Sequence, residues 1–204
     1  MTPRRARWDA LWQRLGAAPS DDALPALENQ YSAPDRHYHT LAHLDTVLGT
    51  FDQLRHLAPN PDIAELALWL HDVVWEPMKD DSELRSAEWP LSHLPPDALP
   101  PCRLAAPLIL ETRHLAVPSV TADAAVVRDA DLAILAAGTA EFDAYERAVR
   151  SEYAMLPVPQ FNAGRARILA DFAARKPLYF TPIGQSWEPR ARANLARSLA
   201  RLEA

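Results

Sequence analysis

The chain is organised around the sequence Ala67-Leu-Trp-Leu-His-Asp-Val-Val-Trp75. Its residues are nearly all apolar, but an ionisable pair, His71 and Asp72, stands among them. A carboxylate in such surroundings is costly unless ion pairing, hydrogen bonding or metal coordination compensates for it. Adjacent residues on a helix project about 100° apart, so both side chains can reach one small object only near a helix end. The pair is therefore either a buried hydrogen bond or part of a metal site.

An apolar helix leads into this pair. Asn60 can cap the helix and Pro61 suits its first position, while the acidic Asp62 favours the positive end of the helix dipole. Apolar residues then recur at helical spacing, at Ile63, Leu66, Ala67 and Leu70. The pattern predicts a helix that carries the chain from Pro61 into His71.

Length, composition and charge limit the class of protein. The 204 residues are enough for one domain with a sizeable core. Apolar residues make up 49% and charged residues 24%, as in ordinary soluble globular proteins. The net charge of −6 and the isoelectric point near 5.6 argue against nonspecific binding to nucleic-acid polymers or to anionic membranes.

Cysteine usage and hydropathy favour a cytoplasmic protein. Cys102 is the only cysteine, so no intrachain disulfide is possible and a reducing compartment is expected. No run reaches the roughly 18 apolar residues of a transmembrane helix. The basic segment Met1–Arg7 lacks the apolar region that follows in a secretory signal. We therefore expect no membrane partner.

Helical periodicity predicts the other elements, and no alternating strand pattern is found. The expected helices cover residues 8–15 closed by Gly16, 20–31, 44–57, 82–89, 102–115 interrupted by Pro107, 122–137, 139–153, 163–175 and 188–202. A polar, histidine-rich loop spans Tyr31–Thr40, and Pro95–Pro101 is expected to be a connector. The prediction is one all-α domain over residues 1–204, built as a helical bundle.

Three places put an imidazole or a carboxylate on an apolar helical face: His43, the His71-Asp72 pair, and either Asp129 or Asp131. Side chains two positions apart on a helix point about 200° away from each other, so these two aspartates cannot both face one metal. Apolar residues at i−4, i+3 and i+4 turn Asp131 toward the core. Asp129 is expected nearer solvent, or as an acceptor behind the metal ligands.

The candidate metal ligands are therefore His43, His71, Asp72 and Asp131. Two imidazoles and two carboxylates form a borderline-hard donor set, which suits a six-coordinate divalent cation with water in the open positions. The identity of the cation stays open among Mn, Fe, Co, Ni, Zn and Mg.

This order of residues resembles the HD superfamily of metal-dependent phosphohydrolases, and in particular a bacterial subgroup of predicted HD hydrolases. The resemblance rests on Tyr31…Arg36-His-Tyr-His39…His43, Trp69-Leu-His-Asp-Val-Val-Trp75, Glu83…Ser86-Ala87, Asp129-Ala-Asp-Leu132 and Glu188-Pro-Arg-Ala-Arg-Ala-Asn-Leu195. It covers most of the chain from Tyr31 onward, with the motif-bearing core at about residues 31–137. One departure is Asp81-Ser82, where the pattern has an amide or acidic residue before Glu83.

The resemblance implies a helical fold in which a His, a His-Asp dyad and a distant Asp surround one metal. It implies hydrolysis of a phosphoester, in a nucleotide or another small phosphorylated metabolite, with a metal-activated water as nucleophile. It fixes no particular substrate. The alternatives are an HD-fold iron-dependent oxygenase, for which only His93 and His114 offer further ligands, and a noncatalytic metal- or ligand-binding module.

Other polar residues are candidates for catalysis, each with a structural alternative. His39 lies four residues before His43, so it can contact the substrate or support a metal ligand. Arg36, Arg85 and Arg113 can contact phosphate, since guanidinium binds phosphate in a bidentate manner, or can simply be solvated. Glu83 can orient water or cap a helix. His114 can bind a second metal, contact substrate or satisfy a polar core position.

Overall fold

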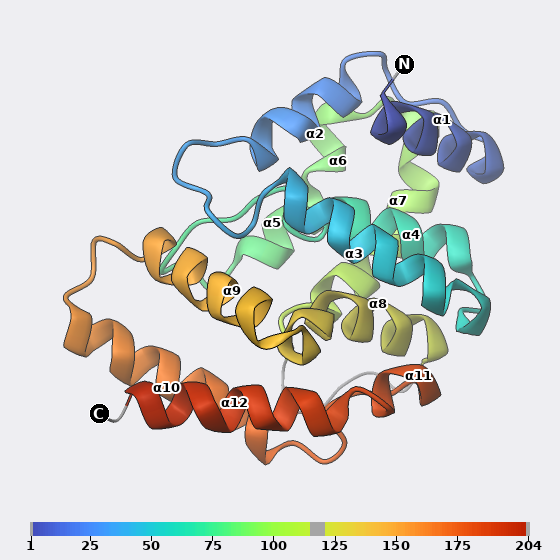
Figure 1. Cartoon of the computed structure of the whole chain (residues 1–204). Coiled ribbons are helices and arrows are strands. Elements are labelled where there is room, and N and C mark those ends of the chain that lie inside the picture. The colour runs from blue at the N-terminus through green and yellow to red at the C-terminus, as the bar shows by residue number, and fades with distance from the viewer. Residues whose placement is uncertain (1, 115–120, 203–204) are drawn as a thin grey trace.

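The computed structural model describes residues 2–114 and 121–202, which contain helices and no strand. The α-helices are α1 (Pro3–Leu15), α2 (Ala23–Tyr31), α3 (Leu41–Leu54), α4 (Pro61–Leu70), α5 (Ser82–Glu88), α6 (Pro90–His93), α7 (Leu99–Glu111), α8 (Ala122–Leu132), α9 (Thr139–Glu152), α10 (Val158–Ala174), α11 (Pro182–Gln185) and α12 (Glu188–Leu202). Short 3₁₀ segments follow α3, precede α7 and follow α8, at Arg55–Leu57, Pro96–Ala98 and Ala133–Ala136. The predicted all-α class is confirmed (Figure 1).

The helices around the central sequence pack closely on one another. α3, α4 and α8 are in mutual contact, and α1 and α7 also pack on α4. α4 is apolar almost all round, with every residue from Ala64 to Leu70 buried, because other helices surround it. It ends at Leu70, so His71 and Asp72 leave the helix where their side chains can turn toward one point.

The buried apolar residues form two clusters. The first joins α1, α2, α3, α4 and α7 with most of α8, around large side chains such as Trp8, Trp12, Tyr31 and Trp69. The second lies among the 3₁₀ segment after α8, α9, α10 and α12, around Phe142, Leu169, Tyr179 and Leu195. α8 contributes Ala130 to the first cluster and Leu132 to the second, so its last turn lies where the two meet.

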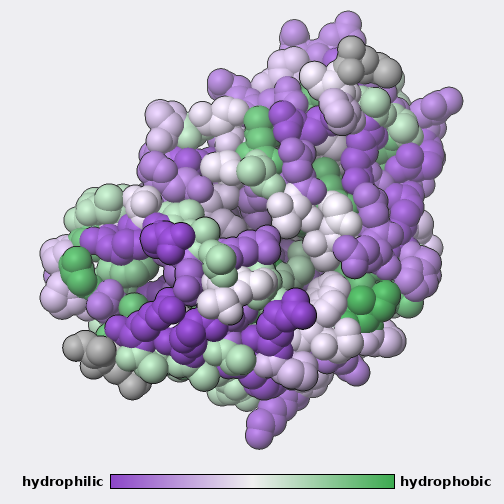
Figure 2. Space-filling view, in the orientation of Figure 1, coloured by the Kyte–Doolittle hydropathy of each residue, from purple (hydrophilic) through white to green (hydrophobic). Residues whose placement is uncertain are grey.

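Polar side chains predominate on one face of the molecule. On the face shown in Figure 2 hydrophilic residues predominate, and the hydrophobic ones form small separate patches. Among the helices that the structure describes, none has both the length and the apolar character needed to cross a membrane.

Prolines account for most of the differences from the predicted helix boundaries. α7 begins at Leu99 instead of Cys102, and α10 begins at Val158 instead of Ala163, because Pro100, Pro101 and Pro159 occupy first turns, where no N–H is required. α7 continues through Pro107 and ends at Glu111; the predicted end at Leu115 lies outside the described residues.

Capping also differs from the prediction at two helices. α2 begins at Ala23 after Asp22, so the predicted cap Ser20 lies outside it. Asn60 precedes α4 but makes no side-chain cap; its amide group donates to Asp123 Oδ2 at 2.8 Å instead. Asn60 therefore fastens the start of α4 to the start of α8.

Candidate metal centre

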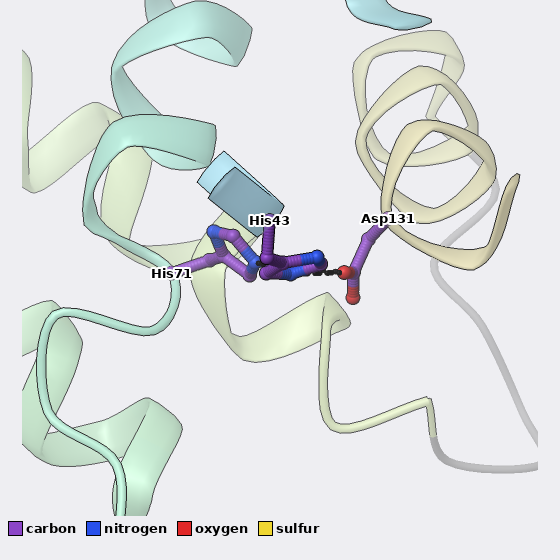
Figure 3. A group of neighbouring side chains, drawn as sticks. All are labelled: His43, His71 and Asp131. Atoms are coloured by element: carbon purple, nitrogen blue, oxygen red, sulfur yellow. Dashed lines mark hydrogen bonds and ion pairs between the residues drawn. The ribbon is translucent and has the colours of Figure 1, made fainter. Parts of the chain in front are cut away.

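Three helical segments bring the predicted metal ligands together. His43 lies in the first turn of α3, His71 and Asp72 follow the last residue of α4, and Asp131 lies in the last turn of α8. Figure 3 shows His43, His71 and Asp131 pointing toward one another from these segments. The ligand atoms of these three residues all lie within 4.8 Å of one another, a group able to hold a metal ion.

The distances between donor atoms are short. His43 Nε2 lies 3.2 Å from His71 Nε2 and 3.4 Å from Asp131 Oδ1. Asp72 Oδ2 lies 3.1 Å from His71 Nε2 and 3.4 Å from His43 Nε2, so Asp72 borders the same point. For metal–ligand bonds of about 2.1 Å, neighbouring ligand atoms are about 3.0–3.4 Å apart in octahedral or tetrahedral geometry. The observed spacing fits a divalent cation.

The hydrogen bonding of His71 also suits a metal ligand. Its Nδ1 atom donates to the backbone oxygen of Leu68 at 2.8 Å, at the end of α4. The neutral ring therefore carries its hydrogen on Nδ1 and directs the lone pair of Nε2 into the cluster. A hydrogen bond from the far ring nitrogen to a carbonyl is the usual support of a metal-binding histidine.

The positive charge of the imidazoles and the negative charge of the carboxylates balance each other within the cluster. Burial acts to lower the pKa of His71, but the carboxylates of Asp72 and Asp131 hold it well above the usual 6.5. Burial acts to raise the pKa of both aspartates, but the imidazoles, with His71 foremost, hold them well below the usual 3.8. Without a cation, these groups are a buried set of ion pairs, and a cation would replace the imidazole protons.

Comparison of the chain with protein-family models, with curated protein sequences and with solved structures found no match. The helical fold and the His-His-Asp group are compatible with the HD-type arrangement that the sequence resembles.

The prediction that Asp129 lies near solvent is wrong. The side chain is fully buried and accepts hydrogen bonds from Phe180 N at 2.9 Å and from Thr181 N at 2.7 Å. It therefore anchors the segment before α11 to α8. Gly184 packs so close to this carboxylate that an added Cβ would lie 2.3 Å from Asp129 Oδ2. Sequence reasoning missed this role because the partners lie some fifty positions away.

Arg36 lies beside the candidate metal centre and forms hydrogen bonds with backbone carbonyl groups. It is buried, and its guanidinium donates to the carbonyl oxygens of His39 at 3.1 Å, Asp72 at 2.6 Å and Val73 at 3.0 Å. It thus ties the histidine-rich loop to the segment after α4. These contacts are structural, and phosphate contact by Arg36 stays a prediction.

His39 lies next to the candidate metal ligand His43 and has an acidic partner. Its Nδ1 donates to Glu152 Oε2 at 2.8 Å, and its ring stacks on Trp75 with 4.5 Å between ring centroids. Its ring centroid is 5.9 Å from that of His43. Glu152, at the end of α9, has no local sequence signal, since its partners are backbone N–H groups more than a hundred residues earlier.

His114 and Glu83 both lie near the aspartates of the cluster. His114 Nε2 donates to Asp131 Oδ2 at 2.8 Å, while Asp131 Oδ1 faces His43 and His71. Glu83, in the first turn of α5, is half-buried; burial raises the pKa of its carboxyl, and the negative charge of Asp72 adds to this.

The remaining candidates have other partners. His93 is exposed and stacks on Trp89, with 4.0 Å between ring centroids. Arg85 is half-exposed and pairs with Glu76 at 2.5 Å, and the exposed Arg113 donates to the carbonyl of Asp80 at 3.1 Å.

Proposed function

We propose that the protein is a metal-dependent phosphohydrolase that acts on a nucleotide or another small phosphorylated metabolite. One observation carries the proposal: three distant parts of the chain, at His43, at His71-Asp72 and at Asp131, place both imidazole Nε2 atoms 3.1–3.5 Å from a carboxylate oxygen of each aspartate. Their order along the chain, and their positions at helix ends, resemble the HD superfamily.

The donor set defines the chemistry. A divalent cation held by these residues supplies a Lewis acid that polarises a phosphoryl oxygen and lowers the pKa of a water molecule. The aspartates keep their negative charge, because the surrounding imidazoles hold their pKa values well below the usual range. His114 steadies the Asp131 carboxylate by donating to its outer oxygen.

The surroundings of the centre favour hydrolysis of a small substrate. Asp72 and Asp131 keep 14% of their side-chain surface exposed, so water can reach the ligand set from their side. Glu83 and His39 lie near Asp72 as further polar groups. Arg113 is the exposed guanidinium in the segment next to His114, and it can approach a bound phosphate.

An iron oxygenase is a less favoured alternative because it needs ligands for a second metal. Of the two additional histidines considered, His93 stacks on Trp89 and its Nδ1 lies 2.9 Å from the backbone oxygen of the same residue. His114 is engaged with Asp131. A metal-binding module without catalysis differs from both in having no turnover.

The test combines metal analysis with a phosphate-release screen. The purified protein is stripped with chelator, reloaded separately with Mn, Fe, Co, Ni, Zn or Mg, and assayed on a panel of nucleotides and other phosphorylated metabolites. We expect one metal ion per chain and phosphate release that chelator abolishes. A dimetal iron centre with oxygen consumption would support the oxygenase, and bound metal with no turnover on the whole panel would contradict a phosphohydrolase.

A further inference from the structure

The carboxylate of Glu152 is held by three consecutive backbone N–H groups. Its Oε1 atom accepts from the N–H groups of His37 at 2.9 Å, Tyr38 at 2.7 Å and His39 at 2.9 Å. The side chain is 3% exposed, although it sits at the C-terminal end of α9, where the helix dipole disfavours negative charge. Four hydrogen bonds to one buried carboxylate make this contact specific.

The same carboxylate fixes the ring of His39. A carboxylate accepts only, so the bond of 2.8 Å from His39 Nδ1 to Oε2 requires the ring hydrogen to be on Nδ1. Trp75 stacks on one face of the ring at an angle of 20°, and Arg36 holds the backbone oxygen of His39. Glu152 and Arg36 therefore both bind the loop, and these contacts fix the orientation of the His39 ring.

The other ring nitrogen is left for a ligand. No hydrogen bond to His39 Nε2 is present within the described residues, and the side chain is 21% exposed. The ring stacks on Trp75 and meets the ring of the candidate metal ligand His43 edge to face, with 5.9 Å between their centroids, so His39 borders the candidate metal centre. A neutral ring with hydrogen on Nδ1 offers Nε2 as a hydrogen-bond acceptor.

We propose that Glu152 is a positioning residue: it fixes His39 so that Nε2 accepts a hydrogen bond from an O–H group, of water or of substrate, at the metal centre. The role of His39 in turnover rests on the proposed function. The effect of Glu152 on the His39 ring does not, and it can be measured without any substrate. The arrangement makes α9 part of the site, although α9 supplies no metal ligand.

The variant Glu152→Gln separates two roles of the side chain. Its amide oxygen can still accept from the three backbone N–H groups, and those three donors outweigh the single ring nitrogen in orienting the amide. The NH₂ group then faces His39 Nδ1 and donates to it, which moves the ring hydrogen to Nε2. The loop stays held while the tautomer is reversed.

The first measurement is ¹⁵N-detected NMR spectroscopy of the histidine rings in the metal-free protein, with His39→Gln used to assign the signals of His39. We expect the Nδ1–H tautomer in wild type and the Nε2–H tautomer in Glu152→Gln. The matched control Ser151→Ala alters the exposed neighbouring residue of α9, and should keep the wild-type signals.

The second measurement uses the substrate found by the screen. We expect Glu152→Gln to lower kcat by about 10- to 100-fold, with KM and metal content close to wild type, as for other residues that act through a partner. In the His39→Gln background the same change should have no further effect on kcat. Wild-type kcat in Glu152→Gln would overturn the role in turnover.

The two proposals can fail separately. An unchanged His39 tautomer in Glu152→Gln overturns the role of Glu152, whether or not phosphate is released from any compound. A reversed tautomer in a protein that hydrolyses nothing on the panel supports the effect of Glu152 on His39 and rejects the proposed function.

Discussion

Two aspartates in the last turns of α8 have different tasks. Asp131 points into the candidate metal centre, where its oxygens lie near three imidazoles. Asp129, two positions earlier, faces the opposite way and binds the backbone of Phe180 and Thr181. The helical angle of about 200° between them separates a chemical role from a structural one within a single helix.

This difference predicts opposite results for two alanine variants. Asp131→Ala should lose metal, because one of the converging donors is gone, and should melt close to the chelator-stripped wild type. Asp129→Ala should keep its metal but lose stability, at about 1–3 kcal/mol for each buried N–H left without an acceptor. Metal content and urea unfolding of both variants decide the matter. Metal loss from Asp129→Ala at full stability would show that the assignment is reversed.

The charges of the buried cluster predict how metal binding depends on pH. Burial acts to lower the pKa of His43, yet Asp131 and Asp72 raise it above 6.5, and the same carboxylates raise that of His71 further. A cation must displace these protons. We therefore expect proton release on binding at pH 7 and an affinity that rises with pH. Calorimetric titration in two buffers of different ionisation enthalpy measures the number of protons; a count of zero at pH 7 would contradict the raised pKa values.

The same shifts set the stability of the metal-free protein. A raised histidine pKa stabilises the fold fully below the unfolded value of 6.5, and that contribution is lost as pH rises through the folded pKa. A lowered aspartate pKa stabilises the fold fully above the unfolded value of 3.8. That contribution is lost as pH falls through the folded pKa. The cluster therefore contributes its full stabilisation between about pH 4 and 6.5.

At the scale of elements, α1 is attached to α4 by a buried carboxylate. Glu65 is 1% exposed and accepts hydrogen bonds from Arg7 at 2.7 Å and Arg14 at 2.9 Å, both on α1. Arg55, just after α3, also donates to it. The three arginines have second partners in Asp52 and Asp62, so positive and negative groups are equal in number. This network fixes α1 on the outer side of α4.

Removal of this carboxylate should destabilise the protein without affecting the metal centre. For Glu65→Ala we expect a loss of about 1–3 kcal/mol in the free energy of unfolding, because the arginines stay partly exposed and water relieves part of the cost. Glu28→Ala, which breaks a half-exposed pair with Arg4, is the matched control and should cost about 0.5 kcal/mol or less. Equal losses in the two variants would mean that burial of Glu65 adds nothing.

The sequence predicts helices well and long-range partners poorly. The apolar repeat and Gly16 predict the opening helix, and Gly16 indeed adopts a left-handed conformation with φ of 68° after Leu15. Prolines mislead because the same residue that interrupts a helix interior is favoured in a first turn. Asp131 could be found from its apolar neighbours at helical spacing. The roles of Glu152 and Asp129 could not, because both carboxylates bind distant backbone N–H groups, which carry no side-chain signal.

At the scale of the whole molecule, the candidate metal ligands lie close to the boundary between the two apolar clusters. His43 lies on α3 and His71 directly follows α4, both helices of the first cluster, and Asp131 lies between Ala130 of the first and Leu132 of the second. A cation that binds only this folded arrangement stabilises it by linkage, by about 2.7 kcal/mol when the free cation is at 100 times its Kd.

This linkage predicts the behaviour of a variant that lacks one donor. Asp72→Ala should be inactive and should melt within about 2–4 °C of chelator-stripped wild type, a difference worth at most about 1 kcal/mol in a chain of this size. Its side chain is partly exposed, so water can replace the lost carboxylate. Differential scanning calorimetry of stripped and loaded forms gives the comparison. A variant that melts far below the stripped wild type would mean that Asp72 serves the fold and not the metal.

The anchor between Asp129 and Phe180 also sets when the site can be completed during synthesis. The ribosome produces His43 first and Asp131 eighty-eight residues later, but the helix that carries Asp131 gains its anchor to the C-terminal part of the chain only after residues 180 and 181 have been added. Nascent chains and fragments that stop before this point lack α12 with its buried Ala191 and Leu195 as well as the anchor, so they should bind the cation weakly, whereas Asp129→Ala loses the anchor alone. Acquisition of metal then becomes a mark of an almost finished polypeptide.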